Sequence, residues 1–162
     1  MCVEGEFVKR VRVPKNQPII GYRAWPWGHV YEETEFDWLR HTIDSNILKS
    51  GLVPVSSNWG KRQETWFGKI AKADVCPSID PNYQYGLHAC SSWQALRQAG
   101  WASKCYRGSV KLWGWVNVYE KGYLAQFGQI EKVIVSKHLL FDFADVKRLR
   151  ALYPWAKVER AR

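Results

Sequence analysis

The chain has 162 residues, a length typical of one globular domain. Apolar residues make up 46% of it and charged residues 24%, a balance that excludes disordered, collagen-like and low-complexity proteins. Ten Trp and a net charge of +9 depart from the average, and residues 101–162 hold 12 basic against 5 acidic residues, where residues 1–100 hold 12 against 10. We therefore expect a single domain over residues 1–162, with residues 156–162 as a loose basic tail.

No stretch of the sequence approaches the roughly 18 consecutive apolar residues of a membrane span, and the first residues contain no apolar signal core. We expect a soluble, unsecreted, cytoplasmic protein with no membrane partner. The cysteines form no CxxC pair, and reduced thiols are expected in a cytoplasm.

A zinc site is the alternative interpretation of the cysteines. Cys76, His88, Cys90 and Cys105 lie within a 30-residue window, and His88 and Cys90 in a strand would point to one face. The usual spacing of zinc knuckles is missing, so ordinary buried thiols are favoured. The sequence predicts no metal and no cofactor.

The first half of the chain favours strands. Residues 7–13 alternate apolar and basic residues up to Pro14, residues 19–25 form a second candidate strand, and residues 14–18 are typical of a turn. Within residues 30–42 a strand rich in Glu and aromatic residues is expected. Residues 53–80 have little pattern, as is common in functional loops.

Two helices are expected in the second half. A strand over residues 85–90 leads to a helix near residues 92–99, with a serine N-cap, Trp93 and Leu96 on one face, and Gly100 after its end. The second helix covers residues 142–153, begins at Asp142 and ends before Pro154. Its buried face should carry residues spaced three and four apart, namely Phe143, Val146, Leu149 and Leu152 or Tyr153.

Between these helices the pattern indicates a β-hairpin over residues 108–128, followed by a strand at Lys132 to Ser136. Alternation predicts an aliphatic face of Val110, Leu112, Val116 and Val118. The expected connection between the two strands consists of Glu120, Lys121 and Gly122, with Gly122 at a positive φ. In this register Tyr119 lies opposite Tyr123, and Trp115 lies opposite Phe127. The other face is then aromatic: Trp113, Trp115, Tyr119, Tyr123 and Phe127.

These elements define an α+β fold, in which one mainly antiparallel, strongly twisted sheet of about five to seven strands packs against two helices. The order of motifs GYRAW, GLHA, GxVxLWGxV and GYxA, with the C-terminal helix, resembles a scattered group of uncharacterised bacterial and phage-borne proteins. The resemblance spans residues 21–153. It implies a shared α+β domain, an association with phages or mobile elements, and no catalytic residues.

The aromatic face and the basic background favour a binding protein whose partner is nucleic acid or an acidic protein. Bases stack on Trp and Tyr, and Lys and Arg contact phosphates. The electrostatic candidates are Arg107, Lys111, Lys147, Arg148 and Arg150. The alternative is that the aromatic face is simply buried by other elements, and burial is the favoured interpretation of that face.

A second class is a pocket for a nucleotide-like or cationic small molecule, lined by aromatic residues with Arg23, His41 and His88 as polar groups. A third class is an enzyme that resembles ADP-ribosyltransferases, with Arg23 or His41, then His88, then Glu120 in the required order. The sequence has no phosphate loop, GxSxG elbow or HExxH motif. Binding without catalysis is therefore favoured.

Overall fold

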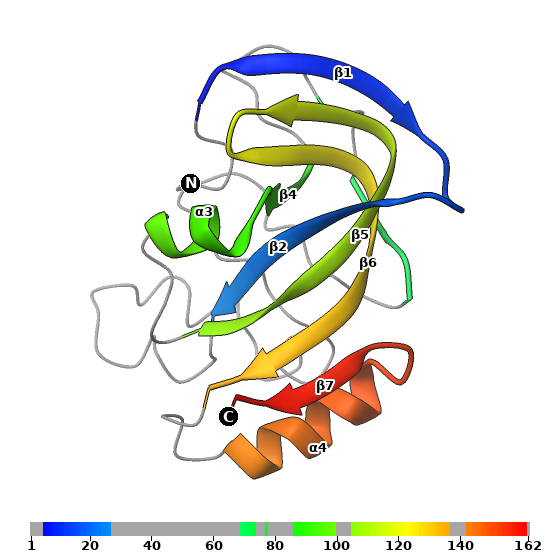
Figure 1. The fold of residues 1–162 in the computed structure, drawn as a ribbon. Helices are drawn as coiled ribbons and strands as arrows, with labels where there is room; N and C mark the ends of the chain where they lie inside the picture. The colour runs from blue at the N-terminus through cyan, green and yellow to red at the C-terminus, as the bar shows by residue number, and fades with distance from the viewer. Residues whose placement is uncertain are drawn as a thin grey trace, which may run out of the picture.

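In the part of the chain that the structure describes, the fold is a seven-stranded sheet with two short helices (Figure 1). The computed structural model describes residues 5–26, 69–73, 77, 86–99, 105–136 and 142–161. The expected strand within residues 30–42 and most of the segment 53–80 lie outside the described residues. The elements are β1 Phe7–Val13, β2 Ile19–Pro26, β3 Ala71–Lys72, β4 Leu87–Cys90, α3 Trp93–Gln98, β5 Cys105–Tyr119, β6 Gly122–Val135, α4 Asp142–Leu152 and β7 Lys157–Arg160.

The long hairpin of β5 and β6 is the centre of the sheet. Along its outer edge, β5 pairs with β2 over its first half and with β1 over its second half. Along the other edge, β6 pairs with β4, β3 and β7. Every pairing is antiparallel except that of β6 with β7, so the sheet is mixed and only mainly antiparallel.

Strands β5, β2, β4 and β6 pair in a closed cycle, because Tyr22 of β2 bridges Cys90 of β4. Two glycines permit this closure. A Cβ on Gly21 would lie 2.6 Å from the Cβ of Ala89, and a Cβ on Gly108 would lie 1.9 Å from the carbonyl oxygen of Lys132. Both positions are therefore points where neighbouring chains approach too closely for a side chain.

The main core lies against the curved hairpin, and Leu149 of α4 and Tyr153, the residue after α4, contribute to it, each 1% exposed. Val146 is half-buried as well, so the helix face predicted at these positions is confirmed; the side chain of Phe143 is outside the described residues. Arg150 donates from Nε and Nη2 to the carbonyl oxygen of Val158, which holds α4 to β7. The largest buried residues of this core are Trp25, Tyr106, Leu87, Leu112, Val110, Val116 and Val133.

Strand β7 corrects one expectation about the C-terminal residues. Residues 157–160 form a strand that runs parallel to β6, and Val158 is 4% exposed. They are not the loose tail that the basic composition suggested. Lys132 and Lys157 both pair with the Glu159 carboxylate, which balances one of the two positive charges.

Helix α3 forms as predicted and packs on β2 and β4. The hydroxyl of Ser92 accepts a 3.0 Å hydrogen bond from the Ala95 amide, which caps the helix. Leu96 is buried with Ala24 and Cys90 in a second cluster, and half-buried Trp93 meets Tyr22 at 4.6 Å between ring centroids. Since Ala24 and Trp25 are adjacent in β2 and belong to different clusters, α3 covers the face of β2 opposite the main core.

The hairpin lies where the sequence predicted it, but the predicted register is wrong. Val118 lies opposite Tyr123, and Trp113 opposite Phe127. The pairing shifts between Trp113 and Val116, at a β-bulge where Gly114 has φ +81°. Gly122, predicted to take a positive φ in the connection, instead pairs with Cys90 as the first residue of β6.

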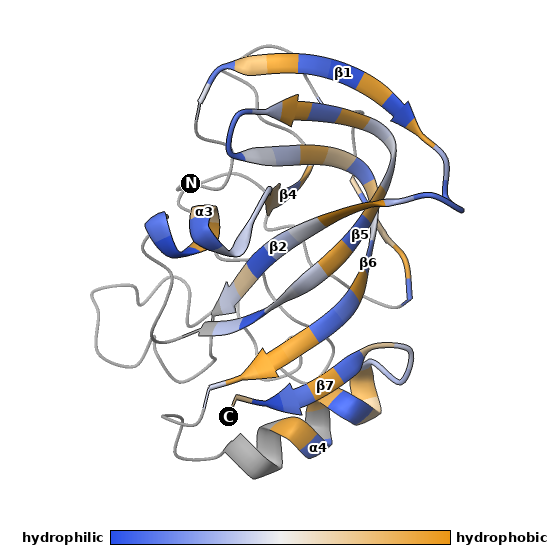
Figure 2. Ribbon diagram, viewed as in Figure 1, coloured by the Kyte–Doolittle hydropathy of each residue, from blue (hydrophilic) through white to orange (hydrophobic). Residues whose placement is uncertain are grey.

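Strand β6 also continues without a break through the residues expected to form a separate third strand. Along β1 the alternation of apolar and basic residues is visible as alternating colour (Figure 2), and only Val11 and Val13 of this strand contribute to the main core. The helices of the described part of the chain are all too short or too polar to cross a bilayer.

Candidate functional site

Two basic residues of the N-terminal strand lie over a tryptophan side chain of β5. Arg12 of β1 lies directly opposite Trp115 of β5. The guanidinium carbon of Arg12 lies 5.8 Å from the centroid of the Trp115 ring, and that of Arg10 lies 4.9 Å from it. Both distances fall within the range of cation–π attraction. Trp115 is 38% exposed, and both arginines are exposed.

A second group adjoins the first, since Trp113 is two residues before Trp115. Trp113 is 8% exposed and stacks on Phe127, with ring centroids 6.1 Å apart and planes 16° apart. The ammonium of Lys15, in the turn after β1, lies 5.8 Å from the centroid of the Trp113 ring. Exposed Lys72 of β3 lies opposite Phe127. We call Arg10, Arg12, Lys15, Trp113 and Trp115 the cationic–aromatic patch.

Acidic side chains are scarce around this patch in the part of the chain that the structure describes. Two residues before Trp113 on β5, Lys111 pairs with Glu131 at 3.5 Å. The hydroxyl of Ser109 donates a 2.9 Å hydrogen bond to the same carboxylate. Glu131 is therefore occupied by partners of its own, and among the described residues no ion pair involves Arg12, Lys15 or Lys72.

The five aromatic residues predicted to share one surface are divided. Trp113 and Phe127 stack, and Trp115 is exposed beside β1. Tyr119 is 6% exposed, belongs to a separate cluster with Leu124, and meets Phe7 of β1 edge to face at 5.8 Å. Tyr123 is half-buried against the main core. The wrong register explains the division, because the bulge changes which of these residues are neighbours.

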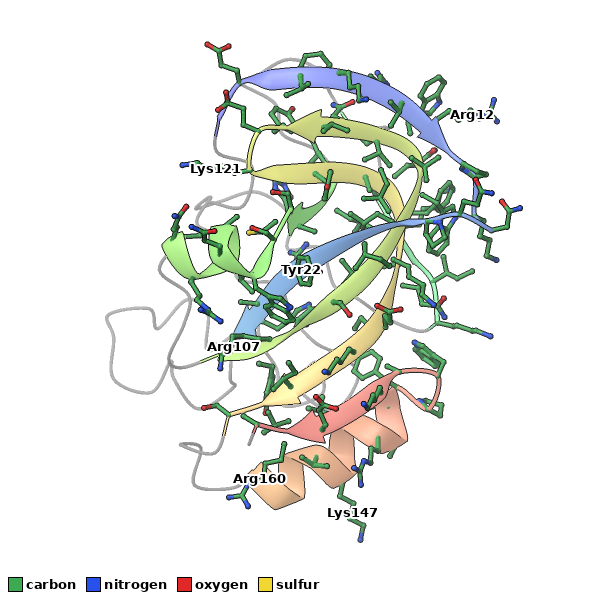
Figure 3. The ribbon with its side chains drawn as sticks, viewed as in Figure 1. Arg12, Tyr22, Arg107, Lys121, Lys147 and Arg160 are labelled. Atoms are coloured by element: carbon green, nitrogen blue, oxygen red, sulfur yellow. The ribbon has the colours of Figure 1, made fainter. Side chains whose placement is uncertain are left out.

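The predicted electrostatic candidates are also spread over the molecule. Lys147 lies on α4 at the end of the molecule opposite Arg12, and Arg107 lies at the start of β5 near neither of them (Figure 3). Lys111 is paired with Glu131, and Arg150 binds the backbone of β7. The side chain of Arg148 is outside the described residues. Arg10, Arg12 and Lys15 were not predicted as site residues from the sequence, although the alternation of residues 7–13 indicated that one side of that strand is basic.

Of the polar residues suggested for a pocket or an enzyme, the structure brings together Arg23 and His88. Arg23 is 5% exposed and its Nη1 donates to the carbonyl oxygen of His88. Glu120 lies at the tip of the hairpin, and its side chain lies against Gly5, just before β1. His41 is outside the described residues.

For the zinc alternative, Cys90 is fully buried beside α3 and His88 is half-buried. The described residues contain no group of three or more metal-ligating side chains. Cys76 and the side chain of Cys105 are outside the described part of the chain.

No protein-family model matches this sequence, no curated protein matches it, and no solved structure matches its fold.

Proposed function

We propose that the protein binds nucleic acid, and that the cationic–aromatic patch is the surface that binds it. The observation that carries the proposal is the position of Arg10 and Arg12 over the exposed ring of Trp115. Phosphates attract clustered cations without regard to sequence, and aromatic rings beside those cations add contacts to bases or sugars.

The distribution of charge favours the cationic–aromatic patch, rather than the other basic regions, as the surface that binds nucleic acid. Around Glu159 two lysines are already paired, and Arg150 donates to a carbonyl oxygen. In the patch, by contrast, Arg12 and Lys15 contact aromatic rings, and a cation–π contact does not neutralise the positive charge. A polyanion can therefore form charge-assisted hydrogen bonds with Arg12 and Lys15 without first displacing a carboxylate of the described residues.

Fluorescence anisotropy with labelled oligonucleotides at about 50 and 200 mM salt tests the proposal. Arg10→Gln/Arg12→Gln should weaken binding and flatten the slope of log affinity against log salt by about 1.4 to 1.8, the contribution of two phosphate contacts. The matched control is Arg97→Gln/Lys147→Gln, which removes the same charge from exposed positions on α3 and α4. Its effect on the slope should be much smaller.

Three results would overturn the proposal. One is the absence of binding to any oligonucleotide at the lower salt concentration, where phosphate contacts are strong. Another is an equal decrease in the salt slope for the patch variant and for the control, which would show that binding depends on the net charge of the protein and not on the patch. The third is equally tight binding of polyglutamate with the same number of charges, which would favour an acidic protein as the partner.

A further inference from the structure

The Trp115 ring is exposed at its rim but covered by the protein's own cations. The indole is 38% exposed, and the guanidinium carbons of Arg10 and Arg12 lie 4.9 and 5.8 Å from the centroid of its ring. A base that stacks on an aromatic side chain needs an open ring face. On Trp115 it would first have to displace the cation–π contacts of the two arginines. The rim of the ring can touch a sugar, but the ring is not a platform for a base.

The other aromatic side chains near the patch are occupied as well. Trp113 is 8% exposed, with Phe127 stacked on it and the Lys15 ammonium 5.8 Å from the centroid of its ring. Among the described residues, the aromatic side chain that equals Trp115 in exposure is Phe7, which begins β1 at the end away from Arg12 and meets Tyr119 edge to face. The patch therefore offers a ligand little flat surface.

What the patch does offer is positive charge at the end of β1 and in the turn after it. Arg12 and Lys15 are both exposed, and no ion pair among the described residues involves either of them. Figure 3 shows Arg12 at the edge of the molecule that β1 forms. The rings beneath these two cations hold them in place and leave their charge intact. Phosphate groups are the part of a nucleic acid that such a surface binds.

Two cations close together suit a high density of phosphates. Arg12 and Lys15 are three residues apart in the sequence, so their Cα atoms lie at most about 11 Å apart. Over about 11 Å of its axis a duplex carries about six phosphate charges, and each of its strands carries about three. Resting on the proposed function, we propose that the patch binds the sugar–phosphate backbone of nucleic acid, with phosphates at Arg12 and Lys15 and no base stacked on it, and that it therefore binds duplexes more tightly than single strands.

The test compares three labelled ligands with about the same number of phosphates. They are a twenty-nucleotide oligothymidine, a strand of twenty abasic phosphodiester units, and a duplex of ten G·C-rich base pairs, each titrated by fluorescence anisotropy at about 50 and 200 mM salt. Wild type should bind the two single strands with affinities less than about 5-fold apart and with the same salt slope, because they share a backbone. It should bind the duplex more tightly, with a slope of about −0.9 per phosphate contact in place of about −0.7.

Variants locate the contacts. Arg12→Gln/Lys15→Gln should weaken the binding of both single strands by the same factor and flatten both slopes by about 1.4, the contribution of two phosphate contacts. The matched control is Arg97→Gln/Lys121→Gln, which removes the same charge from exposed positions on α3 and at the tip of the β5–β6 hairpin, and its effect should be much smaller. Trp115→Leu should change the affinity for both single strands equally, because the ring acts through the cations above it.

The outcomes separate this inference from the proposed function. If oligothymidine binds about 5-fold or more tightly than the abasic strand, the smallest gain expected from one stacked base, the inference is wrong while nucleic-acid binding stands. The same conclusion follows if Trp115→Leu weakens the binding of oligothymidine alone, or if the duplex binds no more tightly than the single strands. If none of the three ligands binds at about 50 mM salt, both are wrong. The comparison of ligands uses wild type, so it decides the question even where a variant does not fold.

Discussion

Gly108→Ala should lower the free energy of unfolding by about 3–5 kcal/mol. A Cβ at this position would lie 1.9 Å from the carbonyl oxygen of Lys132 and 2.9 Å from Cζ3 of Trp25. Gly108 pairs with Arg23 on one side and Val133 on the other, so the strand cannot move away from β6 without pressing on β2. Relief of the contact requires β5 and β6 to separate by more than about 1 Å, which weakens about two backbone hydrogen bonds at roughly 1 kcal/mol each. Overpacking adds about 1–3 kcal/mol.

The assay is urea unfolding followed by circular dichroism and by tryptophan fluorescence, with the m-value checked for constancy. Ser109→Ala is the control, because position 109 already has a Cβ and the change removes only the hydrogen bond to Glu131. It should cost about 1 kcal/mol or less. A loss below about 1 kcal/mol for Gly108→Ala would refute the reasoning, since it would mean that β5 and β6 do not approach each other as closely as described.

Two further predictions concern the C-terminal elements. Leu149→Ala should cost about 2–5 kcal/mol, because Leu149 is 1% exposed, whereas Lys147→Ala on the exposed side of α4 should change stability by less than about 0.5 kcal/mol in the same unfolding assay. Hydrogen bonds from Lys132 and then Lys157 hold the pKa of the Glu159 carboxyl below its ordinary value of 4.5. The stabilisation is present above pH 4.5 and is lost as the pH falls through the lowered pKa, so the difference in stability between wild type and Glu159→Gln should be below about 1 kcal/mol at pH 7 and should shrink as the pH falls below 4.5. A difference that does not change with pH would contradict this cause.

Local signals in the sequence were sufficient for several elements. Ser92 predicted the start of α3 because N-capping acts within one helical turn. The spacing of Val146 and Leu149 predicted the buried side of α4 because residues three apart in the sequence lie on the same face of a helix. The hairpin was also predictable, since Val110, Leu112 and Val116 alternate and all three are fully buried.

What could not be predicted depends on pairing between distant parts of the chain. Arg12 meets Trp115, 103 residues later, and no local pattern indicates which strand a basic strand will adjoin. The bulge at Gly114 is a second example. One inserted residue in β5 preserves the alternation of Leu112 and Val116 in the sequence, but it changes every cross-strand neighbour beyond the bulge. The candidate patch depends on the pairing of β1 with β5, and so only its Trp residues were anticipated.

The pairing of β1 with the far end of β5 also governs the time course of folding during synthesis. Val13 pairs with Gly114, so β1 leaves the ribosome 101 residues before its partner. At about 5–20 residues per second the strand waits roughly 5–20 s with its apolar side exposed. Lys9, Arg10 and Arg12 alternate with those apolar residues, and charges so placed oppose the aggregation of unpaired strands. We therefore expect the charges of β1 to oppose aggregation of the nascent chain until β5 is made.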